Sequence, residues 1–136
     1  MKGLAITSKG LEETAAIEIG ELINKKCEIK DGCSAFEFEK FDDLCVLCYK
    51  AQSVDRILHL ICDFEFEDIG DLEKSLEKAD FGGWLKKHKK FKVECLRVGS
   101  HDFKSVDIEK RLINFINKKY KNAKFGMKEY EIIFFV

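Results

Sequence analysis

Apolar residues recur along this chain at two periods, and the alternation between these periods is the strongest constraint on its fold. Between Leu11 and Ile23 they return every three or four residues, which places them on one face of a helix. Phe36 and Phe38 instead alternate with glutamates, as in a strand with one buried face. Because residues 31–32 are Asp-Gly, a tight turn there predicts a hairpin.

The same patterns continue to the end of the chain and predict an α+β fold. Ser105 is expected to cap a helix whose apolar stripe is Ile108, Leu112, Phe115 and Ile116. The first half is predicted to be β-α-β-α-β, or β-α-β-β-α-β if the hairpin is complete, a ferredoxin-like layer of helices on a sheet. The expected elements are strand 4–7, helix 11–26, hairpin 27–39, helix 42–49, strand 54–66, helix 71–78, turn 80–85 with Trp84 as its anchor, strand 91–98, the Ser105 helix and strand 130–136.

Charge is divided unevenly between the two halves of the chain. Residues 1–68 hold 8 basic and 15 acidic side chains, a balance of −7, whereas residues 69–136 hold 16 and 10, a balance of +6. The basic excess is concentrated in residues 84–128, with 14 basic and 4 acidic side chains. Such a split is typical of contact with nucleic acid or a membrane surface, and a Lys-rich solvated face is the alternative. Since no apolar run suits a membrane helix and the N-terminus is not a signal segment, we expect a cytoplasmic protein without membrane contact.

Neither the cysteines nor the histidines follow a known catalytic or metal-binding spacing. Cys45 and Cys48 make one C-x-x-C, but a zinc ribbon needs a second pair, and the two intervening residues are apolar. We therefore interpret both as reduced core thiols. The three histidines lie far apart, and the chain has no dinucleotide-binding glycine motif, P-loop or nucleophile elbow. For this chain the sequence predicts no catalytic residue, no metal and no cofactor.

The sequence feature that favours RNA binding lies in residues 84–111, where basic residues surround an expected strand, loop and helix. A loop that opens onto a helix N-terminus offers backbone N–H groups and the positive end of the helix dipole, both suited to a phosphate. Flanking cations add counterion release. Phe103 either stacks on an unpaired base or packs beneath the loop, and Arg97 is either a phosphate contact or a structural ion-pair partner. The expected RNA contacts are Lys86, Lys87, Lys89, Lys90, Arg97, His101, Phe103, Lys104, Ser105, Lys110 and Arg111.

Several segments resemble, in order and spacing, the THUMP-containing RNA methyltransferases. The opening KGLEETAAIEIGEL is similar to the start of that family, and SVDRILHLICDF is similar to its Arg-Val-Leu strand. ADFGGWL followed by KFKVECLRVGSHDFKSVDIEKRL resembles the THUMP core, with a Trp anchor, a strand, an arginine, a His/Phe/Ser loop and an Asp-containing helix. The resemblance implies a ferredoxin-like domain over residues 1–68 and a THUMP α/β domain over residues 69–136 that ends before its last strand or strands.

The resemblance also implies that this chain binds RNA and leaves catalysis to another domain. In such proteins the THUMP module holds the acceptor (3′) end of tRNA. In the most similar of them, an S-adenosylmethionine-dependent methyltransferase domain with an Asp/Asn-Pro-Pro-Tyr/Phe signature acts on a guanine amine. This chain has no proline, so that signature is absent. The expected partners are therefore tRNA (or rRNA) and a methyltransferase domain in cis.

Three alternative functions, each for a different class of protein, are also compatible with parts of the sequence. The first is a free-standing THUMP adaptor that delivers tRNA to a modifying enzyme in trans. The second is an RNA recognition motif, which shares the ferredoxin-like topology but requires an aromatic motif that this sequence lacks. The third is a small-molecule regulatory domain of the same topology, against which the basic second half argues.

Overall fold

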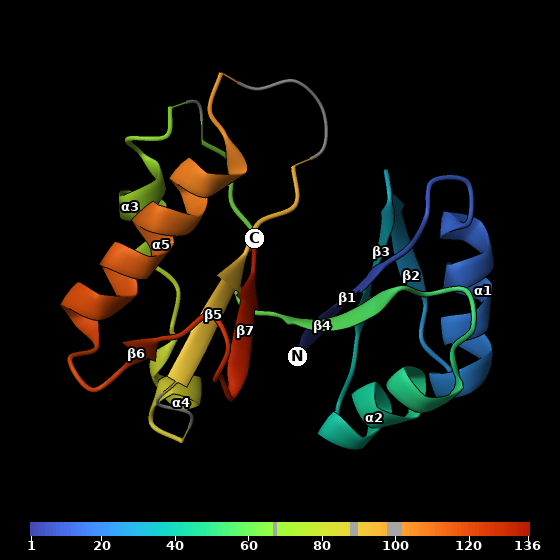
Figure 1. The fold of residues 1–136 in the computed structure, drawn as a ribbon. Helices are drawn as coiled ribbons and strands as arrows, with labels where there is room; N and C mark the ends of the chain where they lie inside the picture. Colours follow the sequence, from blue (N-terminus) through green and yellow to red (C-terminus); the bar gives the residue numbers. More distant parts are fainter. Residues whose placement is uncertain (67, 88–89, 98–101) are drawn as a thin grey trace. The chain divides into compact units, whose positions relative to one another are not determined.

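The computed structural model describes residues 1–66, 68–87, 90–97 and 102–136, which divide into two compact units, Met1–Ile61 and Cys62–Val136 (Figure 1). Both units combine helices with a β-sheet, so the mixed α/β class expected from the sequence is confirmed. Within the described ranges, no helix has the length and apolar character needed to cross a membrane.

The first unit is a four-stranded antiparallel sheet with two helices. Its strands lie in the order β2-β3-β1-β4, so β1 is central and pairs with two strands from later in the chain. The predicted hairpin is confirmed, and Gly32 in its turn has a φ of 73°, which glycine adopts without strain. The elements are β1 (Lys2–Ile6), α1 (Glu12–Ile23), β2 (Cys27–Lys30), β3 (Cys33–Glu37), α2 (Phe41–Lys50) and β4 (Arg56–Leu60).

Both helices of the first unit pack on the same face of its sheet (Figure 1). Ile19 of α1 and Leu47 of α2 are fully buried and share one apolar cluster with Ala5 and Phe36. Gly3 of β1 is the register partner of Phe36, and a Cβ on Gly3 would lie 2.4 Å from Cζ of that ring. The missing side chain of Gly3 therefore provides the space that Phe36 occupies.

Two glutamates of α1 hold neighbouring loops in place. Glu18 accepts hydrogen bonds from the backbone N–H groups of Gln52 at 2.8 Å and Ser53 at 2.9 Å, and from the Ser53 hydroxyl. Burial raises the pKa of Glu18, but these hydrogen bonds together outweigh burial and lower the pKa. Glu12 accepts a hydrogen bond from the N–H of Gly32 at 3.0 Å. The helix thus holds both the hairpin turn and the segment between α2 and β4.

The second unit is a three-stranded sheet in the order β6-β5-β7, with β5 parallel to both neighbours. Since parallel neighbours cannot be joined by a hairpin, the chain crosses between β5 and β6 through the longest helix of the unit. The elements are α3 (Leu72–Leu76), α4 (Gly82–Leu85), β5 (Lys90–Glu94), α5 (Ser105–Lys119), β6 (Lys124–Phe125) and β7 (Ile132–Phe135).

The core of the second unit lies between α5 and the sheet. The apolar stripe predicted for α5 is confirmed, because all four of its residues are buried: Ile108, Leu112, Phe115 and Ile116. The Phe134 ring of β7 meets those of Phe81 and Phe91, with centroids 5.2 and 5.9 Å away. Phe81 and Leu85 anchor α4 in this core, whereas Trp84, the expected anchor, is only half-buried.

The strand predicted over residues 54–66 is wrong beyond Leu60, where β4 ends. The phenylalanines of this segment alternate with acidic residues, but a period of two specifies a strand only where the backbone finds a neighbour to pair with. Within the described part of the chain, no strand pairs with residues 61–66. The Phe64 and Phe66 rings instead contact each other, with centroids 6.1 Å apart.

The interpretation of Cys45 and Cys48 as core thiols is also wrong, because both side chains are exposed. The helix α2 turns Leu47 into the core. Since successive helical residues point about 100° apart, the two cysteines that flank this position project away from the core. A C-x-x-C within an apolar stretch therefore did not imply burial here.

Candidate nucleic-acid interface

The predicted contact residues lie in three places in the second unit rather than in one. At the amino end of β5 lie Lys86, Lys87 and Lys90. Where the chain leaves β5 and enters α5, a region called here the β5–α5 end, lie Arg97, Phe103, Lys104 and Ser105. Within α5 lie Lys110 and Arg111. Lys89 and His101 fall outside the described residues. The first two groups are separated by the length of β5, about 13 Å at roughly 3.3 Å per residue.

At the β5–α5 end, Arg97 has a structural contact. A guanidinium N–H of Arg97 donates a hydrogen bond to the main-chain oxygen of Phe103. The Phe103 ring is half-buried and lies against Phe66, with centroids 5.8 Å apart. Phe103 therefore packs on a neighbouring ring and keeps part of its surface accessible. The next residue, Lys104, is exposed.

The N-terminus of α5 is capped differently from the sequence prediction. Ser105 is the first helical residue, and the N-cap position belongs to Lys104. The Asp107 carboxylate accepts a hydrogen bond from the Lys104 N–H at 2.9 Å, because an acid at the third helical position can reach back to the cap. Glu109 accepts one from the N–H of Cys95 at 3.1 Å. A phosphate at this end would therefore meet two carboxylates as well as backbone N–H groups.

The two predicted contacts within α5 differ in their surroundings. Lys110 is exposed on the solvent face of the helix. A guanidinium nitrogen of Arg111 lies 3.9 Å from the carboxylate of Glu73, which belongs to α3. Both side chains of this pair are partly exposed, 38% and 43%, and such surface pairs contribute at most about 1 kcal/mol. The pair therefore leaves Arg111 able to exchange its partner for a phosphate.

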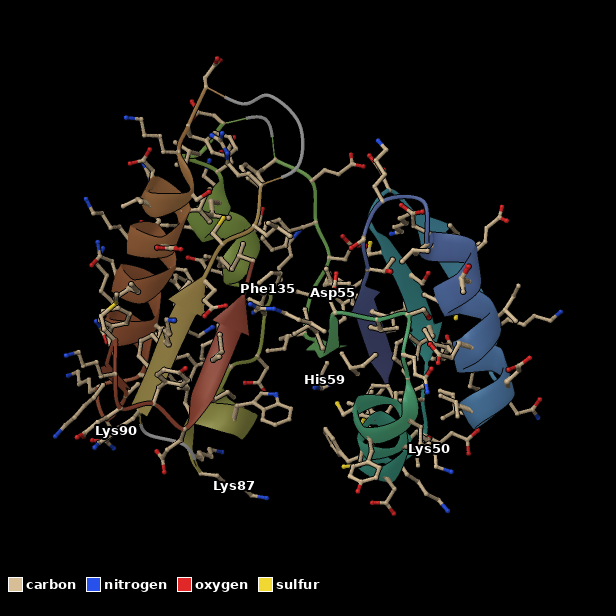
Figure 2. The ribbon with its side chains drawn as sticks, turned by 45° about the vertical axis from the view of Figure 1, so that its right-hand side comes forward. Lys50, Asp55, His59, Lys87, Lys90 and Phe135 are labelled. Atoms are coloured by element: carbon tan, nitrogen blue, oxygen red, sulfur yellow. The ribbon has the colours of Figure 1, made fainter. Side chains whose placement is uncertain are left out.

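At the amino end of β5, Lys90 already has an acidic partner. Its ammonium lies 2.9 Å from Glu129, and the hydrogen bond to that carboxylate raises the pKa of Lys90. The backbone N–H of Lys90 donates to Glu131 at 3.1 Å. Lys86 and Lys87 are exposed, and Figure 2 shows Lys87 and Lys90 at the same end of the unit.

Residues 66–136, more than half of the chain, match the family model of the THUMP domain. The chain belongs to the THUMP domain family. The resemblance drawn from the sequence is thereby confirmed. The THUMP domain extends from the segment before α3 to the end of β7, so it contains every one of the predicted contact residues.

Two curated relatives of this THUMP chain are tRNA (guanine(6)-N2)-methyltransferases. The protein from Archaeoglobus fulgidus is 33% identical over 106 residues, which cover 76% of this chain and 26% of the relative. The protein from Methanocaldococcus jannaschii is 28% identical over 122 residues, which cover 86% of this chain and 32% of the relative. The chain therefore spans about a quarter to a third of the length of the curated relatives it matches.

Solved structures share the fold of the THUMP chain at low sequence identity. The whole chain matches 42% of TrmN from Thermus thermophilus, with a TM-score of 0.74 and 20% identity. It also matches a 4-thiouridine synthetase solved as a complex with RNA and bound ATP, with a TM-score of 0.63 and 17% identity. That match covers 99% of this chain and 37% of the synthetase. At these identities the likeness establishes the fold.

The site expected from the sequence did not include the basic residues that follow Arg111. Residues 110–128 of the THUMP domain contain seven Lys and Arg residues and no Asp or Glu. The signal was present in the charge count over residues 84–128, but the expected contacts were limited to the region around β5 and the start of α5. As for metals, no three His, Cys, Asp or Glu side chains among the described residues are grouped so that they could hold an ion.

Proposed function

We propose that this chain binds the acceptor end of tRNA through its THUMP domain and holds it for an S-adenosylmethionine-dependent methyltransferase that modifies a guanine. The observation that carries the proposal is the THUMP match over residues 66–136, which coincides with the basic half of the chain. The curated relatives are named for methylation of a tRNA guanine. A basic surface suits such a partner, since phosphate contacts supply much of the affinity for any nucleic acid.

The proposed domains are a ferredoxin-like domain over residues 1–68 and a THUMP domain over residues 69–136. The β-α-β-β-α-β order of the first unit and its antiparallel strand order β2-β3-β1-β4 support the ferredoxin-like assignment. The THUMP match, which starts at residue 66, supports the second assignment.

The role proposed for this chain in the cytoplasm is binding, and the methyl transfer belongs to another domain. The chain contains no proline and therefore lacks the Pro-Pro signature expected of the catalytic domain. The curated methyltransferases are three to four times as long as the segments they share with this chain. The methyltransferase, with S-adenosylmethionine as its cofactor, acts in cis or, as a partner enzyme, in trans.

Within the THUMP domain, the β5–α5 end is the proposed contact for the single-stranded 3′ end. The exposed ammonium of Lys104 pairs with a phosphate, and the accessible part of the Phe103 ring stacks on an unpaired base. Arg97 positions Phe103 through the hydrogen bond to its carbonyl. These residues lie next to each other, so one nucleotide step can reach them together.

The test compares tRNA that carries its single-stranded 3′ end with the same tRNA trimmed of it. Intact tRNA is expected to bind at least about tenfold more tightly, since stacking contributes about 1–3 kcal/mol per base. If about four phosphates are neutralised, log K falls against log[salt] with a slope of about −3 to −4. Lys104→Ala is expected to weaken binding of intact tRNA and to change binding of trimmed tRNA little.

The matched control is Glu37→Gln, an exposed acid in the first unit. Glu12 is unsuitable as a control because its carboxylate holds the Gly32 N–H. Equal affinity for intact and trimmed tRNA, or loss of binding from Glu37→Gln but not from Lys104→Ala, would contradict the proposal.

A further inference from the structure

The exposed side of α2 carries two thiols within one helical turn. Cys45 and Cys48 are both exposed, whereas the other four cysteines of the chain are partly buried. Residues three apart on a helix lie on the same face, with Cβ atoms about 5–6 Å apart. Because Leu47 of the same turn is fully buried, the face with the two cysteines points away from the core. The two thiols therefore form a pair that solvent can reach, near the end of α2 that Lys50 marks in Figure 2.

The two thiols also lie close enough to influence each other. Burial raises the pKa of the Cys48 thiol most, and the neighbouring Cys45 raises this pKa further. Two thiolates side by side repel each other, so the pair favours either a retained proton or a cation between the sulfur atoms. The pair therefore has the chemistry of a two-thiolate ligand.

A disulfide between these cysteines requires a closer approach than a regular helix provides. The Cβ atoms of a disulfide lie about 3.5–4.5 Å apart, which is less than the 5–6 Å of helical neighbours. The last turn of α2 is closed by a hydrogen bond from the Ala51 N–H to the Leu47 carbonyl at 2.9 Å. The residues that follow are held by Glu18, which accepts hydrogen bonds from the N–H groups of Gln52 and Ser53. The turn that a disulfide would distort is therefore held at both ends.

An ion between the two sulfur atoms makes a smaller geometric demand. With metal–sulfur bonds of about 2.3 Å, the sulfur atoms lie up to about 4.6 Å apart. Each sulfur lies one bond beyond its Cβ atom and can turn toward the other, so this separation is reached without a change in the helix. The exposed pair on α2 thus suits a bound ion better than a disulfide.

The number and type of ligands select the class of ion. Among the residues that the structure describes, no third His, Cys, Asp or Glu side chain completes a metal-binding group with the two thiols. Zinc takes about four ligands, and calcium and magnesium take about six or more oxygen ligands, so a pair of sulfur atoms suits none of them. Thiolates are soft ligands that select copper(I), and a copper(I) ion accepts two sulfur atoms in a nearly linear arrangement. The pair is therefore a complete ligand set for copper(I).

We propose that Cys45 and Cys48 form a binding site for a single copper(I) ion on the outer face of α2. Each thiol releases its proton to solvent as its copper–sulfur bond forms, and copper stays monovalent, so nothing is oxidised or reduced. The ion links consecutive turns of α2 and stabilises the folded first unit, because the unfolded chain does not hold the two thiols on one face. The site lies in the first unit and does not depend on the RNA contacts proposed for the second unit.

The test titrates the whole chain with copper(I) in the absence of oxygen, in competition with a coloured copper(I) chelator that reports the affinity. Native mass spectrometry gives the number of ions per chain. Cys45→Ser and Cys48→Ser are measured singly. The matched control is Cys33→Ser with Cys62→Ser, which removes two partly buried thiols and leaves the pair on α2 intact.

A second control keeps two exposed thiols on α2 but separates them. Cys48→Ser with Lys50→Cys places the two thiols five residues apart, about 140° around the helix at roughly 100° per residue. Lys50 is exposed, so its replacement leaves the core of the first unit unchanged. Far-UV circular dichroism of each metal-free variant shows whether it is folded.

The unsubstituted chain and the control without Cys33 and Cys62 are expected to bind one copper(I) ion per chain with equal affinity. Each single variant of the pair, and the variant with separated thiols, should bind at least about a hundredfold more weakly, because losing a ligand costs more than losing a group that only orients one, about 10–100-fold. Copper(I) should raise the Tm of the unsubstituted chain and leave the Tm of the single variants unchanged, since only tight binding to the folded state stabilises it.

Three results would overturn this site. The first is tight binding by either folded single variant or by the folded variant with separated thiols, because the spacing of Cys45 and Cys48 on the helix would then not matter. The second is a loss of affinity in the control without Cys33 and Cys62 as large as that in the single variants. The third is one ion shared by two chains in the mass spectrum, because the ligands would then come from a dimer rather than from one α2 helix.

Discussion

Arg97 donates a hydrogen bond from its guanidinium to the main-chain oxygen of Phe103, so the segment after β5 is tied to the residue that precedes the cap of α5. Arg97→Lys keeps the charge but lacks the planar donor group that makes this contact. Since a hydrogen bond from a charged group contributes about 1.5–3 kcal/mol, we expect Arg97→Ala to weaken tRNA binding about tenfold. Arg97→Lys should recover only part of that loss.

The measurement is tRNA affinity at one fixed salt concentration, with far-UV circular dichroism to show that each variant is folded. Full recovery of affinity by Arg97→Lys would show that Arg97 acts only as a charge and would contradict its positioning role.

Gly3→Ala and Gly20→Ala are expected to change the stability of the first unit in opposite directions. A Cβ on Gly3 would lie 2.4 Å from the buried Phe36 ring, so Gly3→Ala should destabilise by about 1–3 kcal/mol. Gly20 lies inside α1, and a Cβ there would meet the Lys25 carbonyl at an ordinary 3.5 Å. Alanine is the better helix former, so Gly20→Ala should stabilise by up to about 1 kcal/mol. Thermal unfolding of both variants measures whether their stabilities change in opposite directions. A Gly3→Ala variant more stable than the unsubstituted chain would contradict the close contact between Gly3 and Phe36.

Glu18 is expected to make the first unit sensitive to acid. Burial raises the pKa of Glu18, but the hydrogen bonds from Ser53 and Gln52 together lower it. A carboxylate whose pKa is lower in the folded state contributes stability above its ordinary pKa of about 4.5, and that stability is lost as the pH falls through the folded pKa. Glu18→Gln should therefore destabilise by about 1–3 kcal/mol at neutral pH, and the difference from the unsubstituted chain should shrink below about pH 4.5.

Denaturant titrations between pH 7 and pH 3 measure this difference. The matched control is Glu21→Gln, an exposed position on the same helix, which should leave the pH dependence of unfolding unchanged. If Glu18→Gln were destabilised by the same amount across the whole pH range, the charge on Glu18 would not contribute to the stability of the first unit.

The exposed thiols of α2 are expected to react in the folded protein. Cys45 and Cys48 are exposed, whereas Cys27 is partly buried. Burial, and then the neighbouring Cys45, raise the pKa of the Cys48 thiol, and burial raises the pKa of Cys27. Since the thiolate is the reactive form, iodoacetamide at about pH 8 should modify Cys45 before Cys48, and Cys27 more slowly than Cys45. Mass spectrometry of peptides at increasing reaction times gives the order, and faster modification of Cys27 than of Cys45 would contradict it.

The sequence was sufficient to predict those elements that are specified by residues close to each other in the chain. The apolar stripe from Ile108 to Ile116 predicted the buried face of α5, because helical spacing and burial depend on the same few neighbours. Asp31 and Gly32 predicted the hairpin turn, because the backbone conformation there requires a residue that tolerates positive φ. The resemblance to THUMP proteins was likewise drawn from short segments in the correct order, and the family match confirmed it.

Features that depend on distant partners could not be predicted in this way. Phe64 and Phe66 show strand alternation, but no described strand pairs with that segment. The two residues of β6 are too few to show the alternation of apolar and polar residues that is typical of a strand. They form a strand only because β5 lies beside them. In the candidate site, the position of Lys90 beside Lys124 follows from the crossover through α5, which sequence spacing alone does not specify.

The parallel pairing of β5 with β7 has a consequence for the order in which the chain folds. Phe91 pairs with Ile132, so the sheet of the second unit closes only after about forty further residues are available. The sheet of the first unit closes earlier in the chain, once Leu60 of β4 is available to pair with Lys2 of β1. Because domains fold from the N-terminus during synthesis, at about 5–20 residues per second, the acidic unit has several seconds on the ribosome before the basic sheet can be completed. The half proposed to bind RNA is thus completed after the acidic unit during translation.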